Sequence, residues 1–169
     1  SVSVLTEYPQ RVRNMFVTQE INKQGVFGIK MYKNGERQTI VIDDHFPCDA
    51  DGDPCFSKAN GNELWVMILE KAWAKIHKSY ERIIGGQAHL TFRDLTGAPS
   101  FEFESTDKDA FERILDGETR NYAMAAGINP LDAEQAKRIN DMGLITEHSY
   151  GLIAAARIKD KEGNDVELV

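Results

Sequence analysis

The chain has 169 residues, of which 41% are hydrophobic and 28% are charged, shares that are typical of globular proteins. Its formal net charge of -7 argues against a nucleic-acid binder, which would need a basic face, and is compatible with divalent cations. No apolar run approaches the roughly 20 residues that a membrane helix needs, so we expect no membrane span.

The first predicted elements are the end of a helix and a β-hairpin. Apolar residues from Leu5 to Phe16 recur at spacings of three and four, which indicates a helix that breaks or restarts at Pro9. Residues 25–32 and 38–43 are typical of two strands. Because Asn-Gly in the segment between them is a strong hairpin signal, we predict an antiparallel pair.

A long polar connection at residues 44–60 contains the acidic run of residues 49–53. This run is similar to the start of a calcium loop, but the sixth and twelfth loop positions hold Pro54 and Asn60 instead of glycine and glutamate. We therefore interpret the run as a solvated acidic turn, with a looser metal contact as the alternative.

The same connection holds both cysteines of the chain, Cys48 and Cys55. Metal binding would need more Cys or His partners than His45, and a nucleophilic thiol is usually activated at a helix N-terminus beside an imidazole. We interpret both as inert loop thiols. Two cysteines in one loop also argue against a disulfide framework and favour a reducing compartment.

The clearest helix prediction covers residues 63–80, where apolar side chains recur at helical spacing. Residues 88–95 resemble a strand, residues 96–99 form a turn between two lobes, and residues 100–104 are another candidate strand. His77 in the helix and His89 in the strand-like segment are interpreted as surface or satisfied side chains.

The last third of the chain predicts two short helices and three strands. Residues 107–115 form an amphipathic helix with a capping aspartate, and residues 132–140 are weakly helical. Residues 121–127 are a strand or buried segment, residues 149–159 an interior strand, and residues 166–169 a last strand. His148 stands at the start of the interior strand, where a structural histidine is the commoner interpretation.

Four blocks in this order resemble the calpain-type cysteine protease core: "NGERQTIVIDDHFP", "GNELWVMILEKAWAKIHKSYERIIGGQ", "FRDLTGAP" and "EHSYGLIAAARI". The resemblance implies an α+β, papain-like fold, with a helical first lobe that carries a β-hairpin (residues 1–97) and a β-rich second lobe (residues 98–169). A cleft between the lobes would hold a Cys-His-Asn triad, in which imidazole activates the thiol for attack on a peptide carbonyl. His148 matches the catalytic histidine.

The resemblance also implies binding residues. Gly85 and Gly86 match the glycine pair whose backbone faces the substrate peptide, and a helix C-cap followed by a turn is the alternative interpretation. Glu63 matches the acidic residue that ligates calcium in the first lobe; the alternative is a carboxylate that interacts with the helix dipole. Glu147, beside the imidazole, would lie at the cleft floor against the substrate.

Three positions depart from the calpain pattern. Calpains usually have glycine before the catalytic histidine and alanine after it, whereas this chain has Glu147 and Ser149, and Arg37 replaces an expected tryptophan. Glu147 crowds the cleft floor, which leaves open a calpain-like pseudoprotease that serves as a binding or scaffolding module.

The triad's cysteine and asparagine would lie just before Ser1 and just after Val169. Since Ser1 is not an initiator methionine, we expect the chain to come from a longer protein, with possible accessory domains. The whole would be a calcium-dependent cytoplasmic endopeptidase that acts on proteins or peptides. The 169 residues alone are predicted to be inactive.

Overall fold

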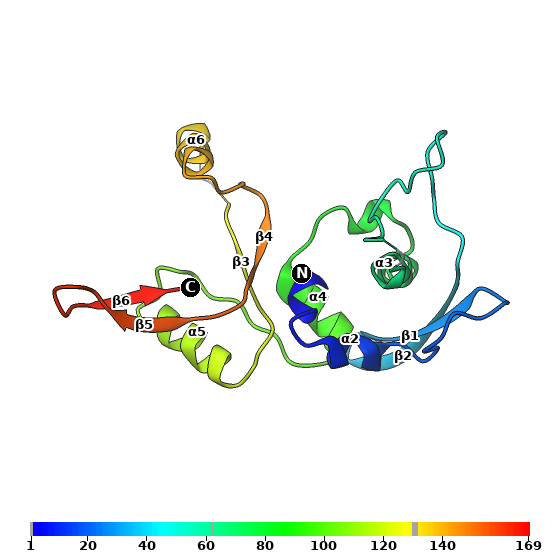
Figure 1. Ribbon diagram of the computed structural model, residues 1–169, viewed down its shortest axis with the longest axis horizontal. Helices are drawn as coiled ribbons and strands as arrows, with labels where there is room; N and C mark the ends of the chain where they lie inside the picture. The colour runs from blue at the N-terminus through cyan, green and yellow to red at the C-terminus, as the bar shows by residue number, and fades with distance from the viewer. Residues whose placement is uncertain (1, 62, 130–131) are drawn as a thin grey trace. The chain divides into compact units, whose positions relative to one another are not determined.

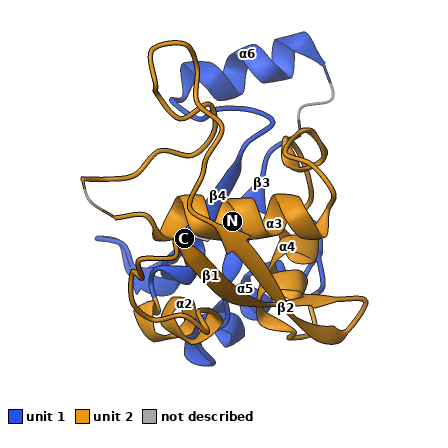
Figure 2. Cartoon of the chain, turned by 90° about the vertical axis from the view of Figure 1, so that its right-hand side faces the viewer, with its two compact units in different colours: residues 1, 3–7, 101–169 blue, residues 2, 8–100 orange. Residues whose placement is uncertain are grey.

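The computed structural model describes residues 2–61, 63–129 and 132–169 and contains two compact units. One unit consists of Val2 and residues 8–100, and the other includes residues 3–7 and 101–169 (Figure 2). Helices and small antiparallel sheets occur together, so the chain is of the mixed α+β class. The boundaries of the two protease lobes, 1–97 and 98–169, stay a prediction.

The first two helices confirm the predicted break at Pro9. Helix α1 spans Val2–Leu5 and helix α2 spans Pro9–Met15, with the proline at the start of the second helix. Proline is tolerated there because the first amide of a helix has no intrahelical partner. Val12 and Met15 are the buried residues of α2.

The predicted hairpin is confirmed as β1 (Val26–Lys33) and β2 (Glu36–Asp43). Asn34 and Gly35, which join the strands, have φ values of 53° and 82°, as an Asn-Gly hairpin turn requires. One face of the pair is apolar at a period of two, and Ile29 lies opposite Ile40 across the strands. This face forms part of the core.

Two helices of the same unit pack against the hairpin (Figure 1). Helix α3 (Trp65–Ile76) buries Met67, Ile68, Leu69, Ala72 and Ala74, which confirms the clearest helix prediction. Lys71 of α3 donates to a carboxylate oxygen of Asp43 at 2.6 Å, and this hydrogen bond holds the pKa of Asp43 at about 2. The helix is therefore joined to the end of β2 by polar as well as apolar contacts.

The strand-like interpretation of residues 88–95 is wrong, because this segment forms helix α4 (Ala88–Thr96). The helix ends at Gly97, whose φ of 73° and bond to the Arg93 carbonyl make a left-handed cap. A 3₁₀ turn, η1 (Glu81–Ile83), precedes α4. The candidate strand at residues 100–104 is also wrong: the segment makes no ladder.

The second unit contains α5 (Ala110–Thr119), β3 (Met124–Gly127), α6 (Ala133–Asp141), β4 (Ser149–Leu152), β5 (Ala156–Lys159) and β6 (Asp165–Leu168). Strand β3 pairs with β4 and β5 pairs with β6, both antiparallel. Helix α6 lies in the chain between β3 and β4 (Figure 1).

The single interior strand predicted for residues 149–159 is wrong. The segment is divided into β4 and β5, which belong to different sheets, and Ile153 between them is 73% exposed. The apolar run therefore leaves the β3–β4 sheet after β4 and continues as β5 in the β5–β6 sheet, instead of forming one strand inside a core. The helix predicted at residues 107–115 is confirmed as α5, with an aspartate, Asp109, at its N-cap. Its carboxylate makes no capping hydrogen bond and pairs with Arg113 instead.

Among the described residues, no helix combines the length and the apolar character that crossing a bilayer requires.

Candidate active-site residues

His148 lies directly before β4 and is exposed, so its ring does not start a buried strand as predicted. The imidazole packs against the ring of Tyr150 in an edge arrangement, with ring centroids 4.9 Å apart. The Tyr150 hydroxyl accepts a 2.7 Å hydrogen bond from the Ile145 amide, which anchors that ring to the preceding turn. The imidazole is thus held from one side and open to a reacting group on another.

The backbone at Glu147 explains the glycine that calpains usually carry before the histidine. Glu147 has a φ of 55°, in the left-handed region that glycine adopts freely and other residues adopt at a cost. Its amide donates to the Ile128 carbonyl at 2.9 Å, which holds this conformation in place. The side chain is exposed, and its predicted role against a substrate stays a prediction.

Ser149, on the other side of the histidine, replaces the usual alanine. Its Oγ atom is buried and has no hydrogen-bond partner among the described residues. A buried hydroxyl without a partner is unfavourable, so the small apolar side chain of alanine suits this position better.

Gly85 and Gly86 lie in the other unit, in the segment between α3 and α4. A Cβ atom added at either glycine would have no neighbour within 4 Å, so an extended chain could approach their backbone closely. The alternative interpretation as a helix C-cap is wrong: the C-caps before them are His77 of α3 and Ile84 of η1. Neither glycine has the positive φ of a left-handed cap.

Glu63 lies just before α3, and its carboxylate accepts a 3.4 Å hydrogen bond from the Trp65 indole. Within residues 2–61, 63–129 and 132–169, no group of three or more His, Cys, Asp or Glu side chains could hold a metal ion. The carboxylate of Asp49 accepts hydrogen bonds from the backbone amides of Asp51 and Asp53 in a local turn.

Cys48 and Cys55 are free and exposed in the long connection. Both belong to the unit of residues 8–100, whereas His148 belongs to the other unit. The connection is held to α3 by Glu70, which accepts hydrogen bonds from both the amide and the hydroxyl of Ser57. Cys48 Sγ donates to the Phe46 carbonyl, and the described residues show no hydrogen bond from either thiol to an imidazole, which a nucleophile requires.

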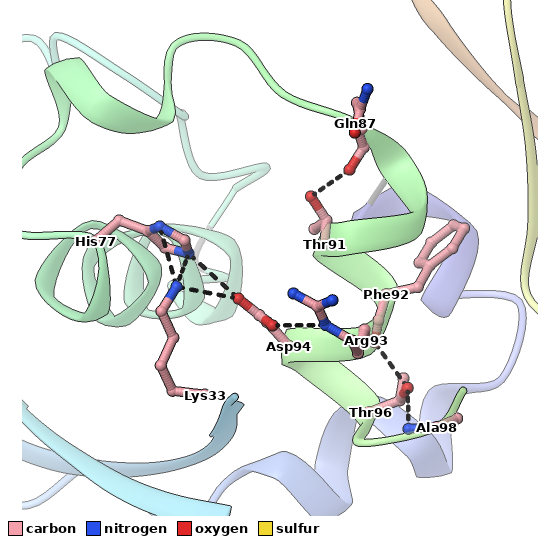
Figure 3. A network of polar contacts seen from close by, with 9 residues as sticks. All are labelled: Lys33, His77, Gln87, Thr91, Phe92, Arg93, Asp94, Thr96 and Ala98. Atoms are coloured by element: carbon pink, nitrogen blue, oxygen red, sulfur yellow. Dashed lines mark hydrogen bonds and ion pairs between the residues drawn. The ribbon is translucent and has the colours of Figure 1, made fainter. Parts of the chain in front are cut away.

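A buried polar cluster, which the sequence did not single out, centres on Asp94 of α4 (Figure 3). The residue is 2% exposed, and its carboxylate lies 3.4 Å from Lys33 Nζ, from His77 Nε2 and from Arg93 Nε. The interpretation of His77 as a surface or satisfied side chain is confirmed in its second form, since both ring nitrogens have polar neighbours. With residues 88–95 interpreted as a strand, no pattern indicated that an aspartate there would face the core.

The charges in this cluster favour a neutral imidazole. Burial lowers the pKa of His77 below 6.5, and repulsion from Lys33 lowers it further, although Asp94 acts in the opposite direction. Lys33 Nζ lies 3.4 Å from Nδ1 and 3.3 Å from Nε2, and a neutral ring with its proton on Nε2 can donate to Asp94 and accept at Nδ1 from Lys33. The buried carboxylate is thereby balanced by the Lys33 and Arg93 cations.

The candidate residues are therefore divided between the units: Glu63, Gly85 and Gly86 in one, and Glu147 and His148 in the other. Within the second unit, the structure places Glu147 and His148 on one turn before β4. The proposed roles of all five stay predictions.

Comparison with known proteins identifies the relatives of the chain. Calpain-type cysteine protease ADL1 of Oryza sativa subsp. japonica is 31% identical over 94% of this chain, as is calpain-type cysteine protease DEK1 of Zea mays. The calpain-1 catalytic subunit of Mus musculus is 32% identical over 86% of it. The matched region spans only 8% of each plant protein and 20% of the mouse protein.

The model of the calpain family of cysteine proteases matches residues 1–169, the whole chain. The resemblance inferred from the four sequence blocks is thereby confirmed. The chain belongs to the calpain family of cysteine proteases.

Proposed function

We propose that the chain is part of the core of a calpain-like endopeptidase that hydrolyses peptide bonds in proteins, with His148 as general base. The match of the whole chain to the family model is the observation that carries this proposal. In the reaction, the imidazole takes the proton of a cysteine thiol and the thiolate attacks the peptide carbonyl. The C–N bond then breaks as the imidazolium gives its proton to the leaving amine, and water hydrolyses the resulting acyl-enzyme to free the acid and restore the thiol. The cysteine and the orienting asparagine come from outside these 169 residues.

The surroundings of His148 support its role. A general base must reach its proton donor, and an exposed ring fixed against Tyr150 is accessible while its orientation is limited. Gly85 and Gly86 supply a backbone surface for the extended substrate, since no atom of the described residues lies within 4 Å of a Cβ added at either glycine.

Substitution of His148 in the natural full-length protein tests the proposal. We expect His148→Ala to reduce peptide hydrolysis by about 10²-fold or more, the usual contribution of a general base. The matched control is His45→Ala, which removes an imidazole whose side chain is 91% exposed in the other unit. Activity that survives in the His148 variant contradicts the proposal. Failure of the wild-type protein to react with a thiol-reactive epoxide probe favours a pseudoprotease.

The 169-residue chain alone is proposed to be inactive, because the partners of His148 lie outside it. A fluorogenic peptide assay checks this: turnover by the isolated chain contradicts the proposed source of the nucleophile.

The two exposed free thiols suit a reducing, cytoplasmic compartment.

We also propose that the natural full-length protein depends on calcium and that Glu63 supplies one of several ligands. The support is the position of Glu63 in the family pattern, together with its exposed carboxylate, whose interaction with the Trp65 indole is long. Calorimetry of the full-length protein against its Glu63→Ala variant tests this. Equal calcium affinity removes Glu63 from the site.

A further inference from the structure

The Asp94 cluster joins the helix before the segment that carries Gly85 and Gly86 to the helix after it. His77 is the C-cap of α3, and residues 78–87 follow it directly as far as Gln87, the N-cap of α4. Asp94 follows in α4, and Figure 3 shows it pointing toward His77 and Lys33. One carboxylate thus connects the helix before the segment with the helix after it.

The cluster also fixes both helices to the hairpin. Lys33 is the last residue of β1, and its Nζ atom lies 3.4 Å from Asp94 and 3.3 Å from the His77 ring. In these ion pairs the carboxylate of Asp94 is the buried partner. Displacement of a cation would leave the negative charge of the carboxylate buried without compensation, so the stability of the cluster is sensitive to the positions of its members. The side chain of Asp94 is 3% exposed, so it has little access to water as a substitute partner.

The segment itself has few contacts of its own around the glycines. Ile84 is 78% exposed, and the space beside Gly85 and Gly86 is open. Before the glycines, η1 contacts α3, and the ring of Tyr80 stacks on Phe56 with centroids 4.3 Å apart. The course of the chain at the glycines therefore depends on where its two ends are held.

We infer that Asp94, acting through His77 and Lys33, is a positioning residue that fixes residues 78–87 and thereby sets the affinity of Gly85 and Gly86 for an extended peptide. The affinity part of this inference rests on the proposed function. The positioning part rests on the cluster alone, and it can be measured without any peptidase activity.

Limited trypsin digestion measures the positioning. Arg82 lies within the segment, and cleavage after it requires local opening. We expect Asp94→Asn to accelerate this cleavage about tenfold, the effect of losing one hydrogen bond to a charged group. Cleavage after Lys23, in an exposed loop of the same unit, serves as the internal reference and should stay unchanged. Equal acceleration at both sites indicates a merely structural role and overturns the inference.

Kinetics of the natural full-length protein measure the affinity. Gly85 and Gly86 would contact parts of the substrate that are distant from the reacting atoms, and such contacts mainly affect substrate binding. Asp94→Asn should therefore raise KM about fivefold and leave kcat within about twofold. The matched control is Asp116→Asn, which removes an exposed carboxylate paired with Arg120 at 2.9 Å, and its KM should not change. An unchanged KM in the Asp94 variant, or a loss confined to kcat, overturns the inference.

The two proposals fail in distinguishable ways. A full-length protein without peptidase activity refutes the proposed function, while the trypsin rates still decide whether Asp94 positions the segment. If Asp94→Asn does not fold, His77→Gln takes its place, because it removes the ring at the C-cap of α3 and leaves the carboxylate intact. The same acceleration after Arg82 relative to Lys23 supports the inference, and its absence overturns it.

Discussion

Replacing Gly97 with alanine should cost far more stability than a change of one methyl group suggests. Gly97 ends α4 with a φ of 73°, and a Cβ atom there would lie 2.5, 2.6 and 2.7 Å from three atoms of the Tyr32 ring. Real Cβ atoms do not approach other atoms so closely, and an aromatic ring cannot bend away as a flexible chain end can. Either the ring or the helix end must move.

Two separate costs add at this position. A non-glycine residue in the left-handed region costs about 1–2 kcal/mol. Forcing an extra methyl group into occupied space costs about 1–3 kcal/mol. We therefore expect Gly97→Ala to lower the free energy of unfolding by about 2–5 kcal/mol.

Urea unfolding followed by tryptophan fluorescence measures this loss, since Trp65 and Trp73 both lie on α3 in the unit that contains Gly97. Gly35→Ala is the matched control: its φ is 82°, but an added Cβ meets nothing within 4 Å, so it carries only the backbone cost. In a Tyr32→Ala background, Gly97→Ala should likewise cost only about 1–2 kcal/mol. The same loss with and without the ring, or a loss below about 1 kcal/mol, refutes the steric argument.

Three further changes test the surroundings of the two histidines. Glu147→Gly should raise the free energy of unfolding by about 1 kcal/mol by removing left-handed strain, and thermal unfolding by circular dichroism checks it. Ser149→Ala should be neutral or stabilising by about 1 kcal/mol because it removes a buried hydroxyl without a partner among the described residues; a clear loss in the same assay shows that the hydroxyl is satisfied. The lowered pKa of His77 means that, below its usual 6.5, the unfolded chain takes up a proton that the folded chain does not. Stability should therefore decrease as the pH falls from about 6.5, and urea titrations should show this slope abolished by His77→Gln and kept by His45→Gln.

Local signals were sufficient for the hairpin and the long helix. The Asn-Gly pair predicts the turn at Asn34, and the helical spacing predicts α3, because in both cases neighbouring residues decide the conformation. The weakly predicted helix α6 also exists, with the Asp132 carboxylate accepting from the Gln135 amide as a cap.

Errors occurred where a short apolar segment fits either conformation. Residues 88–95 alternate well enough for a strand, yet their helical face buries Leu95 and Asp94 together. Residues 149–159 are apolar enough for an interior strand, but the run is shared by two sheets. Periodicity cannot separate these cases over so few residues, because the tertiary partners that decide them lie far away in sequence.

Only some residues of the candidate site could be predicted from the sequence, and the reason differs from one residue to another. The resemblance of whole blocks led to His148, Gly85 and Gly86. The residues alone favoured a structural role for His148 and left a helix C-cap open for the two glycines. The Asp94 cluster unites residues from β1, α3 and α4, and no local pattern reports an ion pair between such distant positions. The left-handed backbone conformation of Glu147 could not be predicted from the glutamate itself. The only indication was that the calpain pattern has glycine at this position.

The three strand pairs differ in how much chain must be closed to form them. The β1–β2 pair closes over Asn34 and Gly35, and the β5–β6 pair over the short turn that begins at Asp160. The β3–β4 pair, in contrast, closes over residues 128–148, a loop that includes α6. Because loop-closure entropy grows with the length of chain that is closed, we expect this pairing to form last of the three and the surroundings of His148 to be completed late in folding.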